Sequence, residues 1–148
     1  MKKIAVLIIL FILGFGSFVH AEEYKHALTF GLYTSHYSGD HCEGVDNRLI
    51  ALENGHLILA DFRNSYGNET QFVGYAYHTK KLYSKHEVWW TRGNVYAGVL
   101  IGYGHQHPIH VGVFSPGVYP TVSVGHDRYS LEMGVMPTFM WWGFKVEF

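Results

Sequence analysis

The chain has 148 residues, and its charge is nearly balanced, with 11 Lys and Arg residues against 12 Asp and Glu residues. This balance argues against a nucleic-acid partner, because binding to phosphates requires a clustered basic face. The chain is also rich in aromatic residues and glycine, with 11 Tyr, 10 Phe, 4 Trp and 17 Gly. Aromatic residues and glycine in alternating segments are typical of a β-barrel with aromatic girdles.

The start of the chain has the features of a secretory signal peptide. Lys2 and Lys3 precede an apolar run over residues 4–13, and Val19-His20-Ala21 ends the segment with a small residue. The apolar run is shorter than the roughly 20 residues that a membrane-spanning helix needs. We therefore expect cleavage after Ala21, so that 1–21 is a signal peptide and 22–148 is one barrel domain of 148 − 21 = 127 residues.

Eight segments of this domain are expected to be β-strands, because apolar side chains recur in them at every second position. They cover residues 27–35, 47–52, 56–65, 71–78, 94–103, 118–124, 128–135 and 138–148. Glu53-Asn54-Gly55 and Gly125-His126-Asp127 are the clearest turn sequences between them. Residues 79–93 form a longer connection, in which either the neighbouring strands extend or an irregular piece intervenes.

The last segment, TFMWWGFKVEF over residues 138–148, carries the strongest signal. One alternate set is apolar throughout: Met140, Trp142, Phe144, Val146 and Phe148. The other set becomes small and then charged: Phe139, Trp141, Gly143, Lys145 and Glu147. Alternation alone also suits a water-soluble sandwich, but an apolar face toward lipid and a mixed face toward a lumen are typical of an outer-membrane barrel. The sequence thus predicts an all-β fold, an eight-stranded antiparallel transmembrane barrel located in the bacterial outer membrane.

This topology brings candidate catalytic residues to one rim. If both chain ends lie in the periplasm, the odd-numbered strands run outward, so the first ends near His36 and the third near Asn64 and Ser65. A histidine and a serine at one rim can act as the base and the hydroxyl of acyl transfer. Loops are rich in both residue types, so this pattern is weak by itself.

Several segments resemble the lipid A palmitoyltransferase family (PagP) of Gram-negative outer membranes. Phe62-Arg63-Asn64-Ser65-Tyr66, followed by Phe72-Val73-Gly74-Tyr75, is similar to that family's Phe-Lys-Asp-Ser-Trp and Ala-Gly-Tyr-Gly at the same spacing. Residues 119–125, Leu131-Glu132-Met133 and Pro137 resemble its sixth and seventh strands, and residues 140–148 resemble its last strand. The resemblance covers most of the expected mature chain.

The resemblance implies an enzyme that needs no metal or other cofactor and moves a palmitoyl chain from a phospholipid to lipid A. It implies catalytic roles for His36 and Ser65. Asn64 stands where the family has Asp, and an amide cannot carry negative charge, although it can orient a group or donate a hydrogen bond to an oxyanion.

The resemblance also implies an acyl site formed by Phe72, Gly74 and Ala76. Ala76 falls at the family's pocket-floor glycine, and its added methyl group favours a slightly shorter acyl chain. Small residues that merely fill a narrow eight-stranded interior explain these positions equally well.

Two other functions fit the same barrel. The departure at Asn64 keeps a non-catalytic surface barrel open, and the same rim residues would serve a lipid A deacylase. We expect a membrane-embedded monomer, with a phospholipid donor and a lipid A acceptor as partners.

The histidines of residues 105–110 (HQHPIH) are dense enough for a metal site. No acidic or thiolate partner accompanies them, however, and Pro108 marks a loop. We therefore expect no metal there.

Overall fold

The regular secondary structure of the described residues consists of β-strands alone. The computed structural model describes residues 26–36, 48–64, 66–86, 88–103, 109–136 and 139–148. The strands are β1 (His26–His36), β2 (Ile50–Asn54), β3 (Leu57–Arg63), β4 (Glu69–His78), β5 (Leu82–Tyr83), β6 (Trp89–Ile101), β7 (Phe114–His126), β8 (Tyr129–Val135) and β9 (Phe139–Glu147). Among these residues, we find no helix long and apolar enough to cross a membrane.

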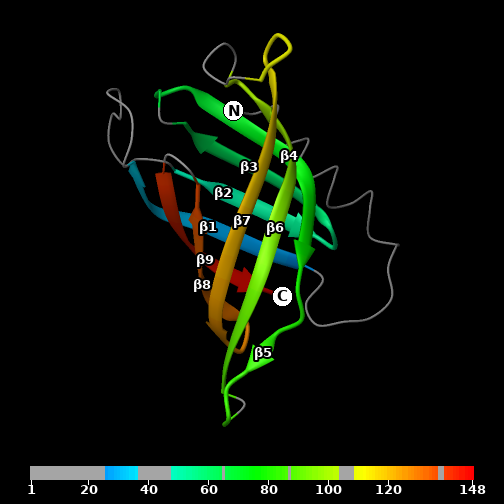
Figure 1. Ribbon diagram of the computed structural model, residues 1–148, viewed down its shortest axis with the longest axis vertical. Coiled ribbons are helices and arrows are strands. Elements are labelled where there is room, and N and C mark those ends of the chain that lie inside the picture. Colours follow the sequence, from blue (N-terminus) through cyan, green and yellow to red (C-terminus); the bar gives the residue numbers. More distant parts are fainter. Residues whose placement is uncertain (1–25, 37–47, 65, 87, 104–108, 137–138) are drawn as a thin grey trace.

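Eight of these strands close into an antiparallel barrel, as predicted (Figure 1). The sheet order is β4-β3-β2-β1-β9-β8-β7-β6-β5, and an additional pairing of β4 with β6 joins the ring. The first and last strands of the chain pair from Ala27–Glu147 to His36–Phe139. We call the rim where β1 begins and β9 ends the base, and the rim where β1 and β3 end the site rim.

The long connection over residues 79–93 combines both alternatives that the sequence left open. β6 begins at Trp89, well before the predicted residue 94, because β7 continues to His126 and supplies a partner for each added residue. The short strand β5 then pairs with this extension, outside the ring of eight, through Leu82–Thr91 and Tyr83–Trp90. β7 likewise begins at Phe114 and is longer than predicted.

A tight turn follows β2 as predicted, but it lies two residues later than the predicted Glu53-Asn54-Gly55, because Glu53 and Asn54 still pair within the ladder to β3. Asn54 pairs with Leu57, which leaves Gly55 and His56 as a two-residue connection. Gly55 has a φ of 59°, a left-handed conformation that glycine adopts without a steric penalty. The turn between β7 and β8 is equally short, since His126 pairs with Tyr129.

The two faces of the barrel wall differ sharply in polarity. Four charged side chains point inward and are at most 3% exposed: Glu53, Glu132, Lys145 and Glu147. Apolar side chains point outward, and roughly half of the surface of each is exposed on β7 and β8: Val118, Val122, Val124, Tyr129, Leu131 and Val135. Proteins that fold in water normally bury apolar groups and expose charges. The predicted division of β9 is confirmed, because Lys145 and Glu147 lie inside while Trp142 and Phe148 are exposed.

Candidate functional site

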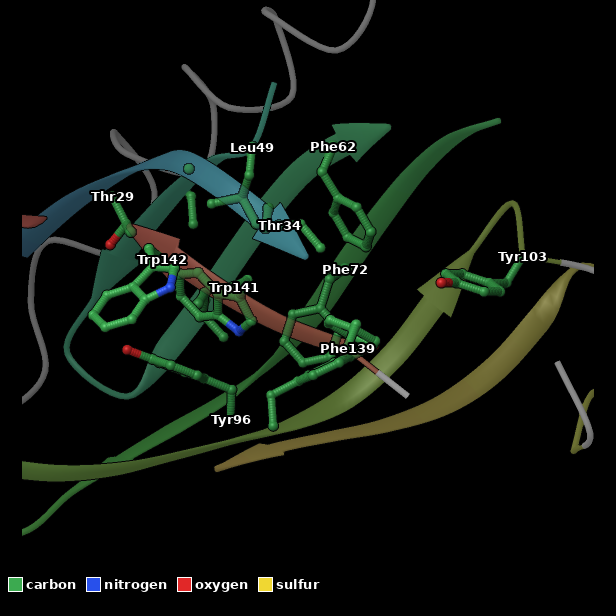
Figure 2. A pocket seen from close by; sticks show the side chains of 15 residues that line it. Thr29, Thr34, Leu49, Phe62, Phe72, Tyr96, Tyr103, Phe139, Trp141 and Trp142 are labelled. Atoms are coloured by element: carbon green, nitrogen blue, oxygen red, sulfur yellow. The ribbon is translucent and has the colours of Figure 1, made fainter. Parts of the chain in front are cut away.

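An apolar cavity of about 90 Å³ occupies the half of the lumen nearer the site rim (Figure 2). Its wall is formed by side chains from seven strands or their ends and includes many aromatic rings: Phe62, Phe72, Tyr96, Tyr103, Tyr119, Phe139 and Trp141. Trp142, which belongs to the outward set and is 39% exposed, also borders the cavity. A single buried water requires roughly 10–15 Å³. The cavity therefore has room for a larger group, and its apolar wall offers water few hydrogen-bond partners.

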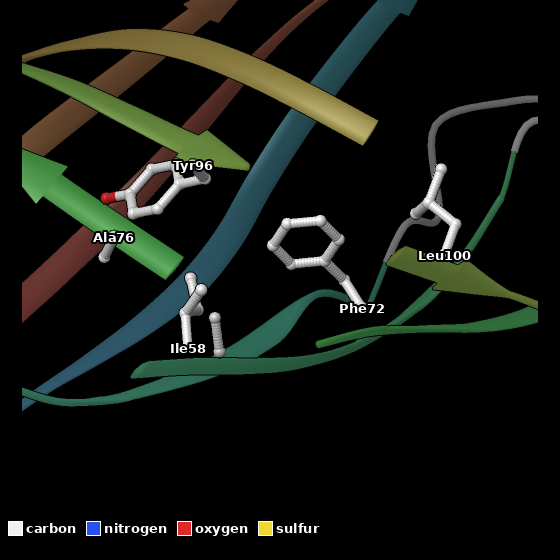
Figure 3. Packing of buried hydrophobic residues seen from close by; sticks show 6 residues of the cluster. Ile58, Phe72, Ala76, Tyr96 and Leu100 are labelled. Carbon is white, nitrogen blue, oxygen red and sulfur yellow. The ribbon is translucent and has the colours of Figure 1, made fainter. Parts of the chain in front are cut away.

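The cavity wall is tightly packed. Phe72 contacts Tyr119 edge-on, with ring centroids 5.5 Å apart. Phe72 also belongs to a buried cluster with Ala51, Ile58, Ala76, Tyr96 and Leu100 (Figure 3). Because interiors packed in this way resist rearrangement, the shape of the cavity is set by the strand register.

Tyr96 forms the floor of the cavity. Its ring lines the cavity, and its hydroxyl donates a hydrogen bond to Glu53 Oε1 at 3.3 Å. The same hydroxyl accepts a hydrogen bond from Lys145 Nζ at 3.2 Å. One side chain thus presents an apolar ring toward the site rim and a polar tip toward the base.

Beneath Tyr96 lies a group of paired charges, which we call the lumen cluster. It contains three carboxylates and four basic side chains: Glu53, Glu132, Glu147, His78, Lys81, Arg92 and Lys145. Lys145 bonds Glu53 and lies 3.8 Å from Glu132 Oε2. His78 Nε2 lies 2.8 Å from Glu53 Oε2.

A second part of the lumen cluster lies closer to the base. Glu147 accepts hydrogen bonds from Arg92 Nη2 at 2.5 Å and from Lys81 Nζ at 2.8 Å. Asn94 joins the two parts, because its Oδ1 accepts a hydrogen bond from Arg92 Nε at 3.0 Å and lies 2.8 Å from His78 Nδ1. The lumen between Tyr96 and the base is therefore occupied by mutually neutralised charges.

Two of the predicted catalytic positions can be placed by their backbones. His36 ends β1 and pairs with Phe139, a residue of the cavity wall. Asn64 directly follows β3, so both positions lie at the site rim. Ser65 lies outside the described residues, and a contact between His36 and Ser65 stays a prediction.

Asn64 organises the connection between β3 and β4. Its side chain is buried, and its Oδ1 accepts hydrogen bonds from the backbone N–H groups of Tyr66 at 2.9 Å and Asn68 at 3.0 Å. Its Nδ2 donates to Thr70 Oγ1 at 2.9 Å. These bonds hold the backbone at Tyr66 and Asn68, so the structure gives Asn64 a role in the turn. Its expected catalytic role as a polar orienter or oxyanion donor stays a prediction.

The predicted acyl-site residues share one inward face of β4. Phe72 lines the cavity, whereas the described cavity wall does not include Gly74 or Ala76. Ala76 is fully buried within the same cluster as Tyr96. The floor is therefore the ring of Tyr96, with Ala76 packed nearby.

Sequence reasoning missed both Tyr96 and the partners within the lumen cluster. The alternation along the strand shows that Tyr96 points inward. How far down the lumen its ring lies depends on the pairing register of β6 with its neighbours. The sequence places Glu53 only in a turn, and its position beside Lys145 follows from barrel closure.

The histidine-rich segment contributes little to the described structure, because residues 104–108 lie outside it. Within the described ranges, no three His, Cys, Asp or Glu side chains are grouped so that they could hold a metal ion.

No protein-family model matches this chain, and no curated protein matches it. The resemblance to PagP stays an interpretation of the residues quoted above.

Replacing Asn64 tests its role in the turn. Asn64→Ala leaves two backbone N–H groups without their acceptor, and we expect a loss of about 1–3 kcal/mol in the free energy of unfolding. Asn64→Asp keeps both acceptors and can accept a hydrogen bond from the Thr70 hydroxyl, so it should cost less. Urea unfolding in detergent micelles measures both variants. Equal losses would show that the side-chain oxygen does not hold the turn.

Replacing Lys145 tests the lumen cluster. Lys145→Met leaves the buried Glu53 carboxylate without its lysine partner, with only His78 beside it, and should lower the free energy of unfolding by about 3 kcal/mol. The double variant Glu53→Gln/Lys145→Met removes both charges and should be more stable than Lys145→Met alone. A double variant whose loss equals the sum of the two single losses would contradict this coupling.

Proposed function

We propose that the chain is a transmembrane barrel of the bacterial outer membrane that takes an acyl chain from a phospholipid and transfers it to lipid A. The observation that carries the membrane placement is the inverted polarity of the barrel wall. On β7, the outward side chains are apolar from residue 114 to residue 124: Phe114, Pro116, Val118, Pro120, Val122 and Val124. These residues span about 33 Å along the strand, or about 25 Å across a membrane at a strand tilt of about 40°. An outer-membrane barrel has an apolar band of this height.

Exposed aromatic side chains near the base support the same placement. Tyr77, Trp89, Tyr129 and Phe148 are each about half exposed and lie at the basal ends of four different strands. Tyrosine and tryptophan favour the boundary between lipid and water. A signal peptide in residues 1–21, as the sequence predicts, would direct the chain across the inner membrane.

The apolar wall of the cavity and its location below the site rim support an acyl site there. Each methylene group that leaves water for an apolar site contributes about 0.8 kcal/mol, so an alkyl chain is the ligand best suited to this wall. The cavity is blocked toward the base by Tyr96 and the lumen cluster. An acyl chain inserted from the site rim would keep its ester group near positions 36, 64 and 65.

In the proposed reaction, Ser65 and His36 perform the chemistry at that ester. His36 accepts the proton of the Ser65 hydroxyl as its oxygen attacks the ester carbonyl. The bond to the phospholipid alcohol breaks, and the alcohol leaves with the proton from His36. A lipid A hydroxyl then attacks the acyl-serine carbonyl while His36 accepts its proton. The acyl–serine bond breaks, and His36 returns that proton to the serine oxygen. A cavity that excludes water favours this transfer over hydrolysis.

One observation favours a second candidate, a non-catalytic barrel. The oxygen of Asn64 is occupied by the turn, a role that any barrel of this shape could require. A lipid A deacylase would use the same rim residues with water as the acceptor.

Charge substitution at two depths tests the membrane placement. Val118→Arg puts a charge near the middle of the apolar band and should cost about 2–4 kcal/mol in vesicles, whereas His126→Arg at its edge should cost about 0–1 kcal/mol. Unfolding in phospholipid vesicles measures both. Equal costs at the two positions would contradict a band that faces lipid.

Mass spectrometry of lipid A tests the reaction. Cells that express the protein should gain one acyl mass on lipid A, and Ser65→Ala and His36→Ala should each abolish the gain. A folded barrel with an unchanged lipid A spectrum would favour the non-catalytic candidate, and a lost acyl mass would indicate a deacylase. Asn64→Asp keeps the side-chain oxygen that holds the turn, so it tests the chemistry of position 64 without removing that acceptor.

A further inference from the structure

A hairpin formed by β5 and the start of β6 extends beyond the base of the barrel (Figure 1). The ladder between β4 and β6 ends at His78–Asn94. β6 extends five residues past this point, to Trp89, which is about 16 Å along the strand. We call residues 79–89 the basal hairpin.

The basal hairpin is attached to the barrel by several contacts. The N–H of Thr79 donates to Gly93 O at 2.9 Å, and the N–H of Ser84 donates to Trp89 O at 2.7 Å. Lys81 Nζ bonds Glu147 inside the lumen and lies 4.3 Å from the centre of the Trp90 ring. These contacts hold the hairpin in one position relative to the barrel.

The surface of the basal hairpin combines apolar and basic groups. Leu82 is 71% exposed and Trp89 is 56% exposed. Trp89 pairs with His126, directly beyond the end of the apolar band at Val124, so its exposed ring continues that band. Lys80 and Lys85 are also exposed. Lys81, by contrast, points into the lumen and pairs with Glu147, so Lys80 and Lys85 are the exposed cations of the described part of the hairpin.

We propose that the basal hairpin is an interfacial anchor that binds anionic phospholipid headgroups in the leaflet next to the base. This inference rests on the proposed transmembrane placement, which puts Trp89 at the boundary between lipid and water. Leu82 and Trp89 enter the acyl boundary, and Lys80 and Lys85 neutralise the phosphates of phospholipids with a net negative charge. A zwitterionic headgroup offers no net charge to the two lysines. The basal hairpin therefore selects anionic phospholipids.

Binding of defined lipids to the folded protein tests this proposal. The mature chain is folded in a neutral detergent and titrated with phosphatidylglycerol or with phosphatidylcholine of the same acyl chains, and bound lipid is counted by native mass spectrometry. We expect tighter binding of phosphatidylglycerol, weakened about fivefold for each of Lys80→Gln and Lys85→Gln. Added salt should reduce the preference, because it screens exposed charges.

Arg128→Gln is the matched control, since Arg128 is an exposed cation at the same rim but in the β7–β8 turn. It should leave the preference for phosphatidylglycerol largely intact. Equal binding of the two lipids by the wild-type barrel, or an equal effect of Arg128→Gln, would overturn the anchor while leaving the membrane placement in force. A chain that fails to fold in detergent at all, shown by the absence of a heat-sensitive gel band, would instead overturn the proposed function.

Discussion

The pairing of buried charges in the lumen is the interaction on which the rest of the structure depends. Glu53, Glu132 and Glu147 are nearly inaccessible, and removal of a carboxylate from water is costly unless a cation and hydrogen bonds replace the water. Lys145, Arg92 and Lys81 supply those cations from β9, β6 and the connection before β5. These contacts require the barrel to be closed and in register. Because side chains alternate along a strand, the same register directs the apolar set to the exposed outer face of the wall.

The lumen cluster also explains where a candidate site can be. It fills the basal half of the lumen, so the open volume is confined to the half nearer the site rim, above Tyr96. The strand ends that carry His36 and Asn64 lie at that same rim. A ligand can therefore place an apolar tail on the Tyr96 ring while its polar end meets the rim. This division of one lumen into an ionic half and an apolar half supports an acyl chain better than a polar ligand.

The sequence predicted the period-two pattern, the eight barrel strands and the inward direction of Lys145, because these depend on local alternation. It did not predict β5, since a two-residue strand depends on the neighbour that β6 offers after β4 has ended. It also missed the contact between Glu53 and Lys145, which are 92 residues apart and meet only when the barrel closes. The alternation predicts that Tyr96 points inward, but only the strand register determines that its ring forms the floor of the cavity. The roles of His36 and Ser65 came from resemblance and stay predictions.

Folding of residues 22–148 with and without lipid tests the central claim most directly. The urea-unfolded chain is diluted either into plain buffer or into phospholipid vesicles, and β-structure is followed by circular dichroism together with heat-sensitive gel migration. An apolar exterior around an ionic lumen predicts a folded, heat-sensitive species in vesicles and aggregation in buffer. A monodisperse, folded monomer in buffer without detergent would contradict the account.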